Sequence, residues 1–293
     1  MTWHLIAHAS ELANVGDFVC LPIGPGREIA ATRLPDGNLM VFDNRCPHRG
    51  ARIFTEMFGN RPPRCGYHGR CVRAADVALG NVGFWAGGRS WLLAFDGRES
   101  GGIPDWVHSL PNLPALERHS VLAYTYPCHW TVAVENALDT EHVAAVHARS
   151  LAPLQIDPIA AIYHGAGSTE EHFETKATRL GVVFPEADPE APGYRHLFMF
   201  PYSALSSTAG AHYSLQHYFP KVDGTTAFIH RLYLTPTPYP TAGNVVAAFN
   251  KQVFEEDAAV CATVAPWHTG RLTATEWRIE EFRKYAAAHE VSR

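Results

Sequence analysis

The chain has 293 residues, of which 46% are apolar and 18% charged, a composition typical of a globular protein with one large or two smaller domains. The formal net charge of -5 argues against nucleic acid as the main partner. No stretch approaches the roughly 18 consecutive apolar residues of a membrane helix, and six cysteines in a chain of this length argue against a disulfide scaffold. We therefore expect a reduced, soluble, cytoplasmic protein without a membrane segment.

Short strands separated by turns are predicted for residues 17–43, with turn signals at "GPG" (24–26) and "PDG" (35–37). Asp-Gly between apolar runs is a strong hairpin signal. Residues 99–120 are rich in Pro and Gly and show little periodicity, which is typical of a connector between domains. The sequence therefore predicts an all-β domain in residues 1–115.

The remainder of the chain mixes helices and strands. A helix is predicted for residues 130–148, and strands are predicted within 194–234, where "KVDGTT" supplies a hairpin turn. Two further helices are expected at 244–264 and 275–289. Strands covered by long helices predict an α+β domain, an antiparallel sheet of the helix-grip type, in residues 116–293.

Two short segments each contain one cysteine and one histidine. Cys46 is followed by His48, and Cys65 is followed by His68. Zinc sites usually take like pairs of ligands, whereas a Rieske [2Fe–2S] centre has two Cys on one iron and two His on the other. We therefore expect a Rieske cluster held by these four residues; a structural zinc site is the alternative.

A second group of metal-ligating residues lies in "HWTVAVENALDTEHVAAVHARS", residues 129–150. Asp139 and His142 are three apart and share a helix face. His142 and His147 are five apart, about 140° around an ideal helix, so both reach one metal only if the helix is widened locally, as in a π-bulge. Two His and one carboxylate form the facial triad of non-haem Fe(II) oxygenases.

The carboxylate of that triad has two possible sources, Asp139 and the helix of residues 249–264. The expected apolar stripe of this helix consists of Phe249, Val253, Val260 and Val264. Glu255 falls off the stripe, while Glu256 and Asp257 both fall within it. Because a carboxylate that faces a core needs a partner, either of the latter two is a candidate ligand, and periodicity does not separate them.

Together these segments resemble the large subunit of Rieske non-haem iron oxygenases, the ring-hydroxylating and demethylating enzymes. The resemblance covers most of the chain, from "VFDNRCPHRGARI" through "CGYHG" and "WTVAVENALDTEHVAAVH" to "VFEED". It departs from the family pattern beside the second Cys/His pair, where Gly66 replaces the usual Pro and Arg70 the usual Trp, followed by Cys71. These changes lie next to the expected cluster, but none removes a ligand.

The resemblance implies a role for each matching residue. His142, His147 and Asp257 would bind the mononuclear iron. Asp139 would be the bridging carboxylate, which contacts His142 in its own subunit and His68 of a neighbouring subunit. Because the family's cluster and iron are too far apart within one subunit, the resemblance implies a homotrimer with electron transfer between subunits.

The implied activity is that of a terminal oxygenase component. A ferredoxin, a flavin reductase or both would supply electrons from NAD(P)H, and O2 would hydroxylate or oxidatively demethylate a small apolar or aromatic substrate, by monooxygenation rather than dioxygenation. Neither nucleic acid nor a membrane is an expected partner. The alternative functions are a Rieske electron carrier with an accessory domain, and a zinc-stabilised binding module.

Overall fold

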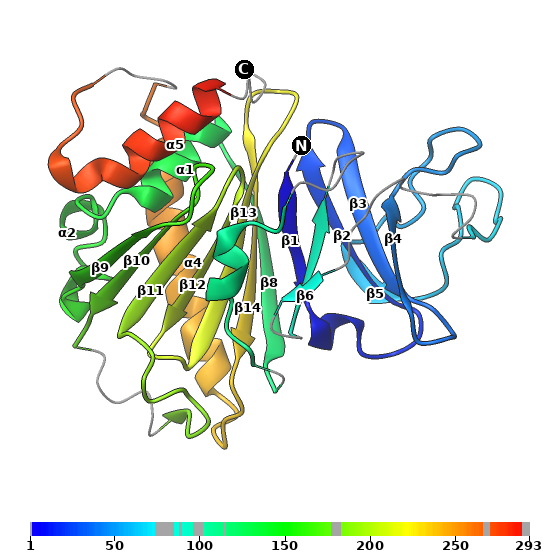
Figure 1. Ribbon diagram of the computed structural model, residues 1–293, viewed down its shortest axis with the longest axis horizontal. Coiled ribbons are helices and arrows are strands. Elements are labelled where there is room, and N and C mark those ends of the chain that lie inside the picture. Colours follow the sequence, from blue (N-terminus) through cyan, green and yellow to red (C-terminus); the bar gives the residue numbers. More distant parts are fainter. Residues whose placement is uncertain are drawn as a thin grey trace. The chain divides into compact units, whose positions relative to one another are not determined.

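The computed structural model divides the chain into two compact units, Met1–Ala115 and Leu116–Arg293. The residues that it describes are 2–73, 85–87, 90–95, 102–113, 115–176, 183–265 and 270–288. Figure 1 traces the chain in the colours of its sequence. In these described ranges, no helix is long and apolar enough to cross a membrane.

The first unit contains two antiparallel sheets. One has the strand order β4–β3–β2–β5, formed by β2 (Asp17–Gly24), β3 (Arg27–Arg33), β4 (Leu39–Asp43) and β5 (Phe58–Asn60). The other has the order β1–β7–β6, formed by β1 (Trp3–His8), β6 (Trp85–Gly87) and β7 (Trp91–Phe95). The expected turn at Asp36 and Gly37 connects β3 to β4, and the φ of +82° at Gly37 explains why glycine stands there.

The core of the four-stranded sheet fixes the base of the two Cys/His segments. Phe18 on β2 stacks on Phe54 with ring centroids 3.9 Å apart, and Phe42 on β4 packs against the same ring. Cys46 and Cys65 belong to this cluster and are 8% and 1% exposed. The thiols therefore lie on the apolar side of their loops, which anchors both loops to one sheet.

The second unit is built on one seven-stranded antiparallel sheet, in the order β8–β14–β13–β12–β11–β10–β9. Its strands are β8 (Glu117–Tyr126), β9 (Asp157–Tyr163), β10 (Thr169–Glu174), β11 (Tyr194–Met199), β12 (Ser203–Thr208), β13 (His212–Pro220) and β14 (Thr226–Leu234). Residues 221–225 turn the chain between β13 and β14, as "KVDGTT" predicts. Side chains alternate between the two faces of these strands, so residues two apart on β13 share a face.

Helices cover the sheet, as the sequence predicts. They are α1 (Trp130–Leu138), α2 (Val143–Val146), α4 (Ala242–Cys261) and α5 (Trp277–Ala288). Figure 1 shows α4 running along the strands, behind them in this view. Phe254 of α4 packs on Phe228 of β14, with ring centroids 4.8 Å apart, and its main-chain oxygen accepts a hydrogen bond from Tyr126 of β8.

Two sequence-based predictions about the helices are wrong in detail. The helix expected at 130–148 is broken, because α1 ends at Leu138 and Asp139 has an extended backbone (φ -78°, ψ 126°). No π-bulge is needed, since the chain bends between the two helices. On α4, Val264 lies beyond the helix end and is 46% exposed, and the buried positions are Gly243, Asn250, Val253, Phe254 and Cys261.

Candidate functional site

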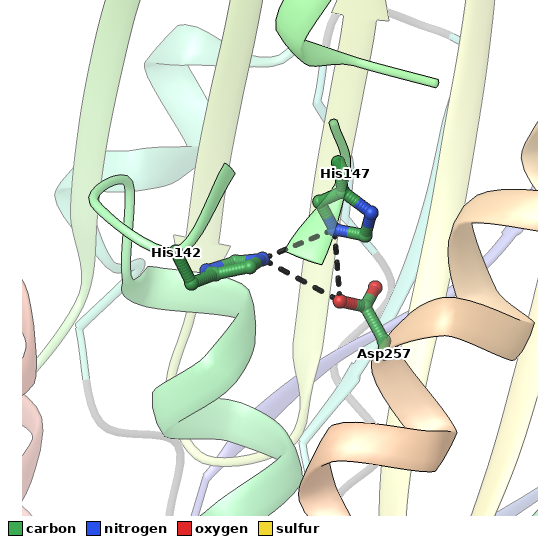
Figure 2. Close-up of side chains that lie close together, drawn as sticks. All are labelled: His142, His147 and Asp257. Atoms are coloured by element: carbon green, nitrogen blue, oxygen red, sulfur yellow. Dashed lines mark hydrogen bonds and ion pairs between the residues drawn. The ribbon is translucent and has the colours of Figure 1, made fainter. Parts of the chain in front are cut away.

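Three of the predicted ligands converge in the second unit: His142, His147 and Asp257 (Figure 2). The Nε2 atoms of the two imidazoles are 3.1 Å apart. The Oδ1 atom of Asp257 lies 3.0 Å from Nε2 of His147 and 3.5 Å from Nε2 of His142. The three side chains are 1% to 15% exposed. Three ligand atoms within 4.8 Å of one another can bind a single metal ion.

The break between α1 and α2 brings the two histidines together. His142 is the residue before α2 and His147 the residue after it, so a single short turn of helix separates them. The carboxylate of Asp139 stabilises the bend, because its Oδ1 accepts a hydrogen bond of 2.7 Å from the main-chain N–H of Glu141. Because the backbone is not one continuous helix, two histidines that are five residues apart direct their rings toward the same point.

Asp257 rather than Glu256 lies at this point. Both residues belong to α4, but Glu256 contacts the opposite side of His147, with Oε2 2.8 Å from Nδ1, and accepts a second hydrogen bond from Ser150. The Oδ1 atom of Asp257 accepts a hydrogen bond of 2.8 Å from Asn136 of α1. The two adjacent carboxylates therefore meet the same imidazole at different nitrogens.

Each histidine has a carboxylate on the nitrogen that faces away from the centre. For His147 this is Glu256. For His142 it is Asp139, whose Oδ2 lies 3.6 Å from Nδ1, an ion-pair distance that is too long for a strong hydrogen bond. The hydrogen bond of 2.8 Å to Glu256 fixes the proton of His147 at Nδ1 and leaves its Nε2 as the donor to a metal.

The electrostatics of the centre follow from these contacts. Burial lowers the pKa of His142, but the carboxylates of Asp139 and Asp257 outweigh burial and raise it to about 9. Burial likewise raises the pKa of Asp257, and the two histidines outweigh it, so that this pKa is lowered. The three side chains therefore favour a negatively charged Asp257 beside positively charged or metal-bound imidazoles. This arrangement suits a divalent cation, which takes the place of the protons at the Nε2 atoms.

The centre borders a small cavity of about 110 Å³, lined in part by Asp139, Tyr218 and Phe254. Three protein ligands beside open space are the donor set of a catalytic rather than a closed structural metal site. The residues therefore fit a mononuclear iron with free coordination positions.

In the first unit, the two Cys/His segments form loops of the same construction. In each, the main-chain N–H of a glycine donates to the cysteine oxygen four residues earlier: Gly50 to Cys46 at 2.7 Å, and Gly69 to Cys65 at 2.8 Å. Both glycines have a left-handed backbone, with φ values of +69° and +67°. A residue with a Cβ would be strained at either position. The shape of each loop therefore explains why a glycine stands four residues after the cysteine.

The two loops meet at the four predicted ligands. The Nδ1 atoms of His48 and His68 are 3.3 Å apart. The Cys65 thiol contacts that of Cys46, and the main-chain N–H groups of Tyr67 and His68 point at it and lower its pKa. Two adjacent thiols, two adjacent imidazoles and amide N–H groups aimed at sulfur fit a [2Fe–2S] centre of the Rieske type.

Sequence reasoning missed two contributors to the site, Asn136 and Ser150, and gave Glu256 only as an alternative metal ligand. Asn136, which donates a hydrogen bond to Asp257, lies inside the "ENALD" part of the quoted motif, so the motif already contained this residue. Ser150 has no spacing signal, because it meets Glu256 through the fold and not along the chain. Glu256 was a candidate ligand by its place in the apolar stripe, and the structure places it at Nδ1 of His147 instead.

Comparison with known proteins matches both units. Residues 113–266 match the family described as ring hydroxylating alpha subunit (catalytic domain), and residues 2–80 match the Rieske [2Fe–2S] domain. The chain is 26% identical over 208 residues to a 3-chlorobenzoate-3,4-dioxygenase oxygenase subunit of Comamonas testosteroni, covering 61% of this chain and 46% of that one.

It is also 26% identical over 236 residues to the carnitine monooxygenase oxygenase subunit of Escherichia coli (strain K12), covering 71% of this chain and 61% of that one. The matches thus span about half the length of these relatives. Among solved structures, a quaternary ammonium Rieske monooxygenase with L-carnitine bound is similar in fold, with a TM-score of 0.76 at 18% identity over 99% of this chain and 89% of that one.

Proposed function

The chain belongs to the ring-hydroxylating alpha-subunit family, and on that premise we propose that it is the terminal oxygenase component of a Rieske oxygenase system. It would use O2 and electrons from NAD(P)H, delivered by a ferredoxin, a flavin reductase or both, to hydroxylate or oxidatively demethylate a small organic substrate. The observation that carries the proposal is the convergence of His142, His147 and Asp257 beside a cavity. An electron carrier needs no such group.

We assign the metal groups to the two units. Residues 1–115 would hold the Rieske cluster through Cys46 and Cys65 on one iron and His48 and His68 on the other. Residues 116–293 would hold the mononuclear iron through the three converging ligands. When bound, the cluster stores and passes single electrons, and the mononuclear iron activates O2.

The protein's own side chains perform the supporting steps. Glu256 holds the proton of His147 at Nδ1, so Nε2 remains free to bind metal. Asn136 fixes the orientation of the Asp257 carboxylate. The Asp139 carboxylate lies at an ion-pair distance of 3.6 Å from Nδ1 of His142. It is the group through which we expect His142 to communicate with His68 of a neighbouring copy in a homotrimer.

Two finer points belong to the same proposal. We favour monooxygenation, because the match to the carnitine monooxygenase subunit covers more of both chains than the match to the 3-chlorobenzoate dioxygenase subunit. We also favour a reducing, cytoplasmic setting, because Cys46 and Cys65 must stay reduced to bind a cluster.

The test is iron and acid-labile sulfide per chain, together with an EPR spectrum of the reduced protein, for the wild type and His142→Ala. We expect about three irons to two sulfides in the wild type. The variant should keep the Rieske signal and about two irons while losing substrate oxygenation. Zinc without sulfide would contradict the redox function altogether. A wild type with only the two cluster irons would support an electron carrier.

A further inference from the structure

Two cysteines that belong to neither metal group meet inside the second unit. Cys128 lies two residues after the end of β8 and two before the start of α1, and Cys261 is the last residue of α4. Both are buried and neither is in a disulfide. The Cys261 thiol donates a hydrogen bond to the sulfur of Cys128. The fold therefore brings two thiols into contact that are far apart along the chain.

The surroundings of Cys128 stabilise its thiolate. Besides the Cys261 thiol, the Thr226 hydroxyl and the main-chain N–H of Ala133, near the start of α1, lie within hydrogen-bonding reach of the Cys128 sulfur. The hydrogen bond from Cys261, together with the other two, outweighs burial and lowers the pKa of Cys128. A thiolate held by such donors at a helix N-terminus is the nucleophilic form of cysteine.

The two thiols differ in accessibility. Cys128 is 8% exposed and Cys261 is 1% exposed, so a small oxidant reaches Cys128 first. Cys261 holds its proton in the hydrogen bond to Cys128, which places a second thiol against the first. An attacking cysteine beside a resolving cysteine is the arrangement that oxidation converts to a disulfide.

The pair connects the two helices that support the mononuclear site. Cys261 follows Asp257 by one turn, about 6 Å along the axis of α4. Helix α1 carries Asn136, whose side chain donates to Asp257. Under the proposed function O2 is reduced beside Asp257, and the two-electron reduction product of O2 is hydrogen peroxide. The thiols therefore lie close to the place where this oxidant would form.

We propose that Cys128 and Cys261 form a dithiol that hydrogen peroxide oxidises reversibly to a disulfide between the start of α1 and the end of α4. The Cys128 sulfur attacks one peroxide oxygen, the O–O bond breaks and hydroxide leaves, which gives a sulfenic acid. The Cys261 sulfur then attacks this sulfur, the S–O bond breaks, and the departing hydroxide takes up the Cys261 proton as water. Two thiols and one peroxide thus give one disulfide and two waters, and a dithiol reductant reverses the change.

The test maps disulfides in anaerobically purified holoprotein after treatment with hydrogen peroxide. Catalase removes the excess, the chain is unfolded in iodoacetamide to block the remaining thiols, and its peptides are identified by mass spectrometry. We expect a linked Cys128–Cys261 peptide to form at least tenfold faster than Cys20 is oxidised, although Cys20 is also only 1% exposed. Dithiothreitol, added before unfolding, should restore both thiols.

Two variants separate the roles of the thiols. Cys261→Ser keeps a hydroxyl beside Cys128 but has no resolving thiol, so dimedone, which labels sulfenic acids, should label Cys128. In Cys128→Ser, Cys261 should stay reduced. Thermal unfolding and the cluster spectrum verify that each variant is folded, and the wild-type disulfide map tests the proposal without them.

The absence of a linked peptide in the wild type, its formation no faster than the oxidation of Cys20, or dimedone on Cys261 in Cys128→Ser would overturn the proposal. The added peroxide replaces any that the protein makes, so the experiment does not depend on oxygenation. A protein that lacks mononuclear iron but forms the linked peptide refutes only the oxygenase, and an active oxygenase that forms none refutes only the dithiol.

Discussion

Replacement of Glu256 by Gln tests whether the carboxylate behind His147 supports metal binding. The charge-assisted contact of 2.8 Å to Nδ1 fixes the ring orientation and makes Nε2 a stronger donor. Loss of such a carboxylate typically weakens metal affinity by about 10- to 100-fold, equivalent to about 1.4–2.8 kcal/mol of binding free energy. Glutamine keeps the size and the hydrogen bond to Ser150 but not the charge, so the change should appear in affinity and not in folding.

The assay is competition for Fe(II) between the iron-depleted mononuclear site and a chelator of known affinity, under anaerobic conditions. The matched control is Glu255→Gln, one residue away on α4, where the side chain is 57% exposed and pairs only with Lys251 in the described structure. We expect the control to match the wild type. An unchanged dissociation constant in Glu256→Gln, or an equal loss in the control, would refute the reasoning.

Three further predictions follow from contacts in the second unit. Asp257→Ala should lose the mononuclear iron and keep the Rieske EPR signal, as metal analysis will show. Glu170 is 2% exposed. Burial raises the pKa of its carboxyl, but His164, Arg195 and His172 outweigh burial and lower this pKa. Glu170→Gln should therefore lower the free energy of unfolding at pH 7 by about 3 kcal/mol, as measured by urea titration. Because the lowered pKa stabilises the fold above the glutamate's ordinary value, the difference should shrink as the pH falls below about 4.5, and a pH-independent difference would contradict the ion-pair account. Burial, and to a smaller extent the nearby His212, lower the pKa of His230 to about 3. Between about pH 6.5 and 3, protonation of this histidine therefore favours the unfolded chain by up to about 1.4 kcal/mol per pH unit. The stability of His230→Leu should depend less steeply on pH than that of the wild type.

The sequence predicted the type and order of most elements, because turn residues and apolar periodicity are local signals. The hairpin at Asp36 and Gly37 and the strands within 194–234 follow from such signals alone. The break after Leu138 does not, because the run of residues 130–148 contains neither Gly nor Pro, and a tertiary site rather than propensity ends the helix.

The sequence predicted the residues of the candidate site better than it predicted their geometry. Pattern and resemblance named His142, His147 and Asp257, and the structure brings them together, yet periodicity alone left Glu256 and Asp257 equivalent. Their difference is the direction of two adjacent side chains on α4, which depends on where the broken α1–α2 segment places His147. The cavity beside them depends on contacts between α4 and three strands, which no local pattern records.

Helix α4 forms a wall of the cavity beside the metal ligands and also carries one of these ligands. Val253 and Phe254 line this cavity, and Asp257 follows about 4.5–6 Å further along the helix axis. A helix is nearly incompressible over one turn, so a compound that displaces Phe254 also displaces Asp257. Occupancy of the cavity should therefore change the coordination of the metal. We expect the spectrum of a bound metal ion to change when a compound fills the cavity, before any electron is transferred.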